Sequence, residues 1–326
     1  MTGIFKQKSP ANFIVLLFFG LLLKLPFFFN PHIPHVTEND GFLYKELVAL
    51  LHRTGKMIFP ITAWLLLFTN AVILTRIING NRMMASPNWF PGMSYMLITS
   101  LFPEWNYLSP ALIVSTIILF VIHQLLSVYN QQDAKGRIYN IGLAVGIASF
   151  LFLPSAGFAL WVLLALIIMR PFRITEWIVC LLGVATPFYF FAVWLFVSGQ
   201  WEIQRLIPDV SFGIPEIKQS VWIAGAVSLL LIPFLFGGYY VQDGLRKMLI
   251  QVRKAWSLLL LFILFAFFVP FVNGTNSFEN WLLAAIPFAA FHASMYLYSS
   301  LRIIPLLLFW ITVAYIIAFQ YGGPRW

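Results

Sequence analysis

Charged residues are scarce in this chain. Only 10% of its 326 residues are Asp, Glu, Lys or Arg, whereas 61% are apolar. An ordinary soluble domain is about half apolar and about one quarter charged. The chain therefore lacks the polar side chains that a water-exposed surface of this size needs, which excludes a soluble globular protein and indicates a polytopic membrane protein.

Cysteine and several enzyme motifs are also missing. The single cysteine, Cys180, lies in an apolar run, so the sequence provides neither a disulfide framework nor a thiolate metal site. It contains no G-x-x-x-x-G-K-[ST], no G-x-G-x-x-G, no H-E-x-x-H and no C-x-x-C motif. ATP-driven transport by this chain alone, dinucleotide redox chemistry and zincin proteolysis lose their main support. We predict no metal and no cofactor, with a divalent cation left open.

Apolar runs dominate what is present. About 20 such residues are needed to cross the hydrocarbon core as a helix. Eight runs meet this requirement: Ala11–Phe29, Met57–Ile78, Leu108–Val128, Ile174–Val197, Ser220–Tyr240, Trp256–Val272, Asn280–Tyr298 and Ile303–Tyr321. Three more are shorter or broken: Trp89–Phe102, Ile138–Leu153 and Gly157–Met169. The sequence thus predicts one all-α integral membrane domain over 1–326 with about eleven transmembrane helices.

Basic residues exceed acidic ones by 20 to 11, and their distribution predicts the topology. With the amino terminus inside and the carboxyl terminus outside, thirteen basic and three acidic residues fall inside, and seven basic and eight acidic residues fall outside. This is the bias of the positive-inside rule. It requires Trp89–Phe102 to cross, as a short segment. The basic surplus is then explained by topology, and no nucleic-acid partner is predicted.

Two outer loops, 30–56 and 198–219, are long enough to hold a site. The first has helical periodicity over about 41–53. One face of this predicted helix is apolar and contains Leu43, Leu47, Leu50 and Leu51. The opposite face is polar and contains Lys45, Glu46, His52 and Arg53. We expect an amphipathic helix lying in the membrane interface.

Glu38 and Asp40 stand just before this amphipathic segment. A carboxylate at the outer membrane surface could act as a general base on a lipid-linked substrate presented at the interface. The alternative is structural: Asp40 is the N-cap of the helix and Glu38 is a solvated loop acid. His32 and His35 lie three positions apart in the same loop, and Pro31 and Pro34 favour an extended backbone over a metal site.

Polar residues inside the apolar runs are few. Asn70, His123, Gln124 and His292 are the candidates. Functional roles are the default for groups at this depth, but an interhelical hydrogen bond explains Asn70 and His292 equally well. The Asp and Glu residues all fall at the ends of the apolar runs or in loops, which argues against a proton-coupled transporter. Gly142 and Gly146 form a G-x-x-x-G that predicts close helix packing.

The sequence also resembles known families. The acids after the first helix, followed by Asp40-Gly-Phe-Leu-Tyr44, Leu47-Val-Ala-Leu-Leu51 and Thr54-Gly55, resemble the first outer loop of GT-C glycosyltransferases. Pro87-Asn-Trp-Phe-Pro-Gly-Met-Ser-Tyr95 is similar to their proline-rich entry into an early helix. The stretches Phe5-Lys-Gln-Lys-Ser-Pro-Ala-Asn12 and Leu22-Leu-Lys-Leu-Pro26 resemble a family of bacterial inner-membrane proteins that has no established activity.

The GT-C resemblance implies a transferase that takes a sugar or headgroup from a lipid carrier, such as a polyprenyl phosphate, at the outer leaflet of the bacterial inner membrane. In this interpretation Glu38 or Asp40 is the base, His52 and Arg53 contact phosphate, and the second outer loop lines the acceptor side with Trp201, Glu202 and Asp209. The alternative is a non-catalytic membrane subunit, scaffold or substrate carrier of an envelope-assembly complex. Membrane lipids are expected partners in either case.

Overall fold

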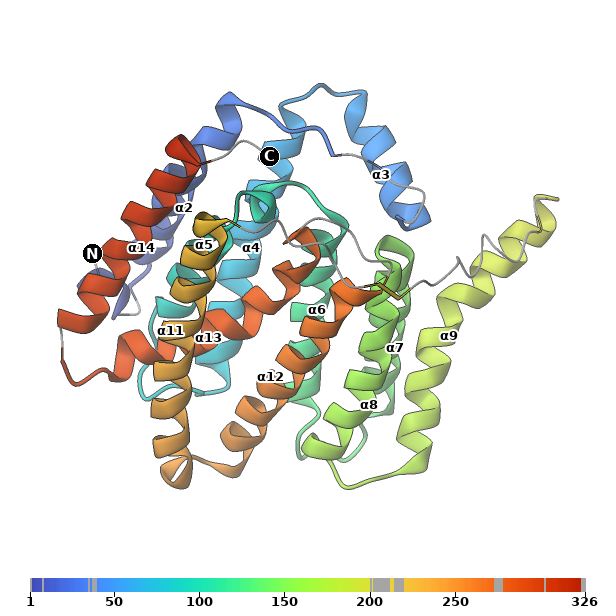
Figure 1. Ribbon diagram of the computed structural model, residues 1–326. Helices are drawn as coiled ribbons and strands as arrows, with labels where there is room; N and C mark the ends of the chain where they lie inside the picture. The colour runs from blue at the N-terminus through green and yellow to red at the C-terminus, as the bar shows by residue number, and fades with distance from the viewer. Residues whose placement is uncertain are drawn as a thin grey trace.

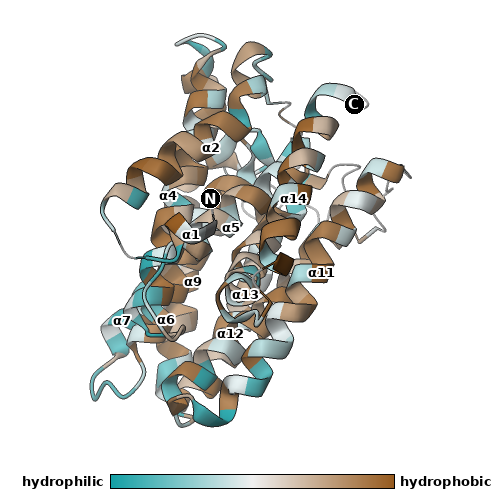
Figure 2. Cartoon of the chain, turned by 90° about the vertical axis from the view of Figure 1, so that its left-hand side faces the viewer, coloured by the Kyte–Doolittle hydropathy of each residue, from teal (hydrophilic) through white to brown (hydrophobic). Residues whose placement is uncertain are grey.

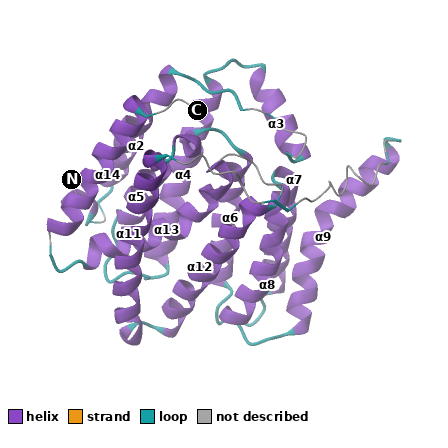
Figure 3. Ribbon diagram, viewed as in Figure 1, coloured by secondary structure: helices purple, strands orange, loops and turns teal. Residues whose placement is uncertain are grey.

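A computed structural model shows a bundle of helices. It describes residues 2–7, 9–34, 36, 40–199, 201, 212–213, 220–272, 278–301 and 303–323. Within these ranges the chain is almost entirely helical and has no strand, apart from an isolated bridge between Phe212 and Val272 (Figure 3). The predicted all-α fold is confirmed.

Long apolar helices make up most of the bundle. Eight segments among the described residues are long and apolar enough to cross a membrane. They are formed by α2 (Ala11–Phe29), α4 (Ile58–Gly80), α6 (Pro110–Ser127), α9 (Ile174–Val197), α11 (Val221–Gly244), α12 (Ile250–Phe268), η5 (Phe278–Ala284) with α13 (Ala285–Tyr298), and α14 (Ile303–Gly322). The protein is therefore a multi-pass membrane protein.

Shorter elements complete the fold. They are α1 (Thr2–Phe5), α3 (Phe42–His52), α5 (Phe90–Leu101), η1 (Pro103–Asn106), α7 (Lys135–Leu151), η2 (Leu153–Gly157), α8 (Phe158–Met169), η3 (Leu245–Lys247) and η4 (Val269–Phe271). Together with the eight long segments, α5, α7 and α8 account for the eleven segments expected from the sequence.

The two ends of the bundle differ in charge. The loops after α6, α8 and α11 lie together at the bottom of Figure 1, and we call this the basic end after its residues Lys135, Arg170, Arg173, Arg246 and Lys247. Hydrophilic residues gather there, whereas the middle of the bundle is mostly apolar (Figure 2). The other end carries α3, η1, η2 and η5, and we call it the acidic end after Asp40, Glu104 and Glu279. That the basic end faces the cytoplasm stays a prediction.

Small residues allow the closest helix contacts. A Cβ at Gly146 of α7 would lie 2.6 Å from the carbonyl oxygen of Val184 in α9, and a Cβ at Gly142 would overlap the carbonyl group of Cys180. Gly183 of α9 meets the backbone of Tyr139 in the same way. These glycines bring the two helix backbones into direct contact, as the G-x-x-x-G pattern predicted.

Helix α5 is short because the protein itself surrounds it. All twelve of its residues are buried. It starts beside the basic end of α4, where Asn79 donates a hydrogen bond of 2.8 Å to the carbonyl of Asn88, and the chain leaves it at the acidic end, where Leu108 accepts 3.0 Å from the hydroxyl of Tyr44. The segment therefore runs from the basic end to the acidic end of the bundle, and that it crosses the membrane stays a prediction. Because lipid does not contact it, α5 need not match the hydrocarbon thickness alone.

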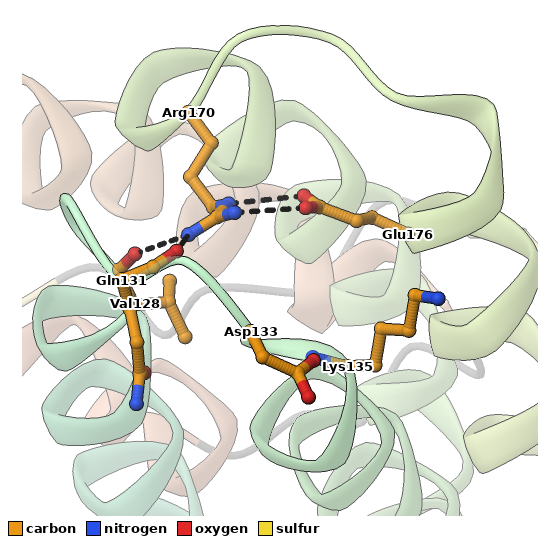
Figure 4. A network of polar contacts seen from close by, with 6 residues as sticks. All are labelled: Val128, Gln131, Asp133, Lys135, Arg170 and Glu176. Atoms are coloured by element: carbon orange, nitrogen blue, oxygen red, sulfur yellow. Dashed lines mark hydrogen bonds and ion pairs between the residues drawn. The ribbon is translucent and has the colours of Figure 1, made fainter.

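An ion pair fixes the basic end. Arg170 donates through Nη2 and Nε to the carboxylate of Glu176, at 2.9 and 3.1 Å, and both side chains are buried (Figure 4). Nη1 of Arg170 also donates to the carbonyls of Val128 and Gln131. One guanidinium thus ties the α6–α7 loop to the α8–α9 loop by four hydrogen bonds, all of them charge-assisted.

Candidate functional site

The candidate site lies at the acidic end, where five separate pieces of the chain meet. They are the end of α2, the end of α5 with η1, the start of α3, the start of η5 and the loop over 31–34. Most of these pieces are too short or too polar to cross a membrane. The long helices around them hold them together at one level.

Lys24 lies beneath this cluster and is fully buried. Its Nζ donates to the hydroxyls of Thr99 and Ser100, each at 3.1 Å, and to the side-chain oxygen of Asn106. All three ammonium hydrogens are used. No carboxylate among the described residues lies within ion-pair distance of Nζ. A buried cation held only by neutral oxygens is costly, so it requires an explanation beyond packing.

Two short 3-10 helices clamp the cluster from the side. The carboxylate of Glu104 in η1 accepts a hydrogen bond from the backbone N–H of Phe278, the first residue of η5. The indole Nε1 of Trp105 donates 2.7 Å to the carbonyl of the same Phe278. Asn106 completes η1 and reaches Lys24. This places the adjacent carboxyl of Glu279 close to that of Glu104.

Two tyrosines, Tyr44 and Tyr107, lie close to the acidic side chains of the cluster. Burial raises the pKa of Tyr44, and the carboxylates of Glu279 and Asp40 raise it further. Burial also raises the pKa of Tyr107, with added contributions from Glu104 and Glu279. Negative charge nearby disfavours the phenolate. Asp40 and Glu279 therefore lie near Tyr44, and Glu104 and Glu279 lie near Tyr107.

Asp40 holds its place because the backbone next to it is docked. Gly41 lies against α7 so closely that a Cβ there would be 2.6 Å from the carbonyl carbon of Leu151. Gly41, not Asp40, is the N-cap of α3, and no side chain caps the helix. The capping role considered for Asp40 is therefore wrong.

Helix α3 confirms the predicted helical segment after the first long helix. Tyr44 and Val48 are buried against the bundle, whereas Leu43 and Leu50 are 40% and 63% exposed. The docking of Gly41 and the Tyr44 hydrogen bond fix the rotation of the helix about its axis. Exposed leucines agree with an apolar face turned away from the protein, and that this face lies in the membrane interface stays a prediction.

An apolar cavity of about 320 Å³ adjoins the cluster. Trp105 and Phe278, the two residues of the η1–η5 clamp, form part of its wall. The rest is apolar and comes from α11, α12, η5 and α13, including Val227, Ile263, Trp281, Ala284 and Phe288. A cavity with such a lining suits a hydrocarbon chain, with polar groups at only one edge.

The structure brings together only part of the predicted site. Asp40 belongs to the cluster. His52 and Arg53 are exposed at the other end of α3, about 12 Å along the helix axis from Tyr44. There the ring of His52 contacts that of Phe59. Trp201 is 54% exposed and packs on Phe196. Four residues lie outside the described ranges: Glu38, Glu202 and Asp209 of the predicted site, and His35.

Sequence reasoning missed Lys24, Glu104 and Glu279 as site residues and counted them only as outer charges. Their positions carry a weak signal. Lys24 interrupts an apolar run beside Pro26, and Glu104 sits in Pro-Glu-Trp-Asn between two helices. Tyr107 was also missed, although the ring of His32 stacks on it at 4.2 Å and covers the cluster.

No group of three or more His, Cys, Asp or Glu in the described part of the chain could hold a metal ion. Polar groups deeper in the bundle are used structurally. Asn70 donates 2.8 Å to Ser115 in a neighbouring helix, and His292 contacts the carbonyl of Leu230 at 2.7 Å. Both are interhelical hydrogen bonds, as the sequence allowed.

Comparison with known proteins identifies no relative. No protein-family model matches the chain, and no curated protein and no solved structure matches it at the significance required. The argument for function therefore rests on the site.

Proposed function

We propose that the protein is a GT-C-like transferase that acts on a lipid-linked sugar or lipid headgroup at the membrane surface. One observation carries this proposal: three carboxylates and two tyrosines converge at one end of the bundle, beside an apolar cavity that shares the wall residues Trp105 and Phe278. A lipid-linked substrate has the same arrangement of a polar head on a hydrocarbon chain.

Asp40 is the proposed general base. It would accept the proton of the acceptor hydroxyl as the hydroxyl oxygen bonds to the anomeric carbon of the sugar. The bond from that carbon to the phosphate oxygen breaks, and the lipid phosphate leaves with the electron pair. Glu104 and Glu279 would orient the sugar hydroxyls, since the oxygens of a carboxyl group accept such hydrogen bonds. Glu38, two positions before Asp40 in the sequence, remains a second candidate for the base.

Lys24 supports this proposal as a positioning residue. Through Asn106 it holds η1, and η1 carries Glu104 and Trp105. The roles of Arg53 and His52 as phosphate contacts, and of Trp201, Glu202 and Asp209 on the acceptor side, stay predictions. The cytoplasmic membrane of a bacterium, with the acidic end outside, is the proposed location, because the basic end then obeys the positive-inside rule.

The test is complementation of a deletion strain by single variants. Asp40→Asn removes the base with almost no change in volume, and Glu46→Gln on the exposed face of α3 is its matched control. We expect Asp40→Asn to abolish complementation while the protein stays in the membrane at wild-type level, and Glu46→Gln to complement. Full complementation by Asp40→Asn, and also by the double variant with Glu38→Gln, would contradict the transferase and favour a non-catalytic subunit, scaffold or carrier.

A further inference from the structure

A second pocket lies far from the acidic end, between the start of α2 and the end of α4. It measures about 630 Å³. Phe13 of α2, Arg76 and Asn79 of α4, and Trp89 before α5 are among its lining residues. It lies at the basic end, because Asn79 is hydrogen bonded to the chain that enters α5. The transferase proposal makes no use of it.

Arg76 is the charged member of this pocket. It is exposed in the last two turns of a membrane-crossing helix, about 6 Å before the helix ends. The structure gives it no hydrogen bond or ion pair to any described residue. A guanidinium at this depth reaches the level of the lipid headgroups, where it can bind a phosphate through two parallel hydrogen bonds.

The walls around Arg76 are both rigid and partly apolar. Phe13 packs edge-on against Trp89 with ring centroids 6.2 Å apart. The backbone N–H of Trp89 donates 2.8 Å to the carbonyl of Phe5, and Asn79 exchanges two hydrogen bonds with Asn88. The indole nitrogen of Trp89 is buried and has no partner among the described residues. Aromatic rings beside a cation suit the junction between a headgroup and its acyl chains.

The charge of the lining segments selects an anion. Neither 1–37 nor 54–103 contains an Asp or a Glu, and the residues Lys6, Arg76 and Arg82 of these segments lie at the basic end. A zwitterionic headgroup would bring its own cation into this field. An anionic phospholipid would not, and each basic residue near the surface favours its binding.

We propose that this pocket binds one anionic phospholipid of the leaflet at the basic end, with its phosphate on Arg76 and its glycerol and first acyl carbons against Phe13 and Trp89. The site ties α2 to α4 through lipid. A free phosphate would leave most of the volume and the aromatic wall unused, so the lipid is the occupant to which the chemistry points.

The test is lipid titration of the purified full-length protein in detergent, followed by native mass spectrometry. The probes are dioleoylphosphatidylglycerol, dioleoylphosphatidylcholine and inorganic phosphate. We expect one phosphatidylglycerol to bind more tightly than phosphatidylcholine. Arg76→Gln should weaken phosphatidylglycerol binding about five-fold, whereas Arg137→Gln, a matched exposed arginine on a helix at the same end, should leave it unchanged.

Three results would overturn the proposal. They are equal affinity for the two lipids, an equal effect of Arg76→Gln and Arg137→Gln, and an Arg76-dependent adduct with inorganic phosphate at comparable concentration. If Arg76→Gln does not fold, Arg76→Lys provides the test. This variant keeps the positive charge but loses the planar guanidinium, so it should bind phosphatidylglycerol more weakly than the wild type. Unchanged binding by Arg76→Lys would then contradict the site.

Discussion

The contact between α7 and α9 provides the sharpest structural prediction, because the single cysteine of the chain lies in it. Cys180 is 1% exposed, and its carbonyl group faces Gly142. In Gly142→Ala the new methyl carbon would lie 3.0 Å from the carbonyl carbon of Cys180 and closer still to its oxygen. Carbon atoms pack at about 3.5–4.0 Å, so the two helices must separate by roughly 0.5–1 Å at this point.

The free-energy cost of this separation depends on how rigid the atoms are that face the new methyl group. The atoms in the way are backbone atoms of α9, which cannot rotate aside as a side chain can. Overpacking of this kind costs about 1–3 kcal/mol. A change of 1–2 kcal/mol alters an opening equilibrium by a factor of about 5–30. We expect the Cys180 thiol to react with a maleimide faster by a similar factor in Gly142→Ala.

The assay is the rate of a gel shift with a polymer-linked maleimide, on protein purified in mild detergent. No other thiol contributes, since Cys180 is the only cysteine. Gly136→Ala is the control on the same helix, because a Cβ at Gly136 meets nothing within 4 Å. Equal labelling rates for Gly142→Ala, Gly136→Ala and the wild type would refute the direct backbone contact between α7 and α9.

Two further predictions concern buried charges. Arg170→Met leaves Glu176 buried without its partner, so we expect the protein to lose about 3–5 kcal/mol of stability in detergent thermal unfolding, whereas the exposed Arg173→Gln should unfold like the wild type. An unchanged melting temperature for Arg170→Met would show that the pair is not formed. Lys24→Met should leave the stability of the protein unchanged or raise it, because it replaces a buried cation by an apolar chain. The variant should nevertheless fail to complement a deletion strain. Marked destabilisation of Lys24→Met, or full complementation, would contradict a positioning role.

Sequence reasoning reached the fold because lipid imposes simple rules. Apolar length places the crossings, and helices stand at all eleven predicted segments, eight of them long and apolar enough to cross a membrane. The helix α5 was also expected, because the basic loop after α11 could not otherwise lie with the other basic loops, and its membrane crossing stays a prediction. The packing of Gly142 and Gly146 followed from their spacing alone.

The site was harder to predict because it is assembled from distant segments. Asp40 stands out in the sequence, being the start of an amphipathic stretch. Glu104 and Glu279 are 175 positions apart, and two hydrogen bonds bring them together, from the Phe278 N–H to Glu104 and from the Trp105 indole to the Phe278 carbonyl. The hydrophobic periodicity of the sequence does not predict that these two residues lie close together. The rotation of α3 about its axis also depends on a distant segment, since Gly41 docks against Leu151.

The central claim is that a lipid-linked substrate occupies the apolar cavity beside the acidic end. The most direct measurement is mass spectrometry of lipids that co-purify with the protein from native membranes. We predict a polyprenyl-phosphate-linked sugar or other lipid-linked headgroup with the wild type. We predict its loss in Val227→Phe, which fills the cavity, and its retention in Val221→Phe, at an exposed site on the same helix. Co-purification of bulk phospholipid alone by all three proteins would contradict the account.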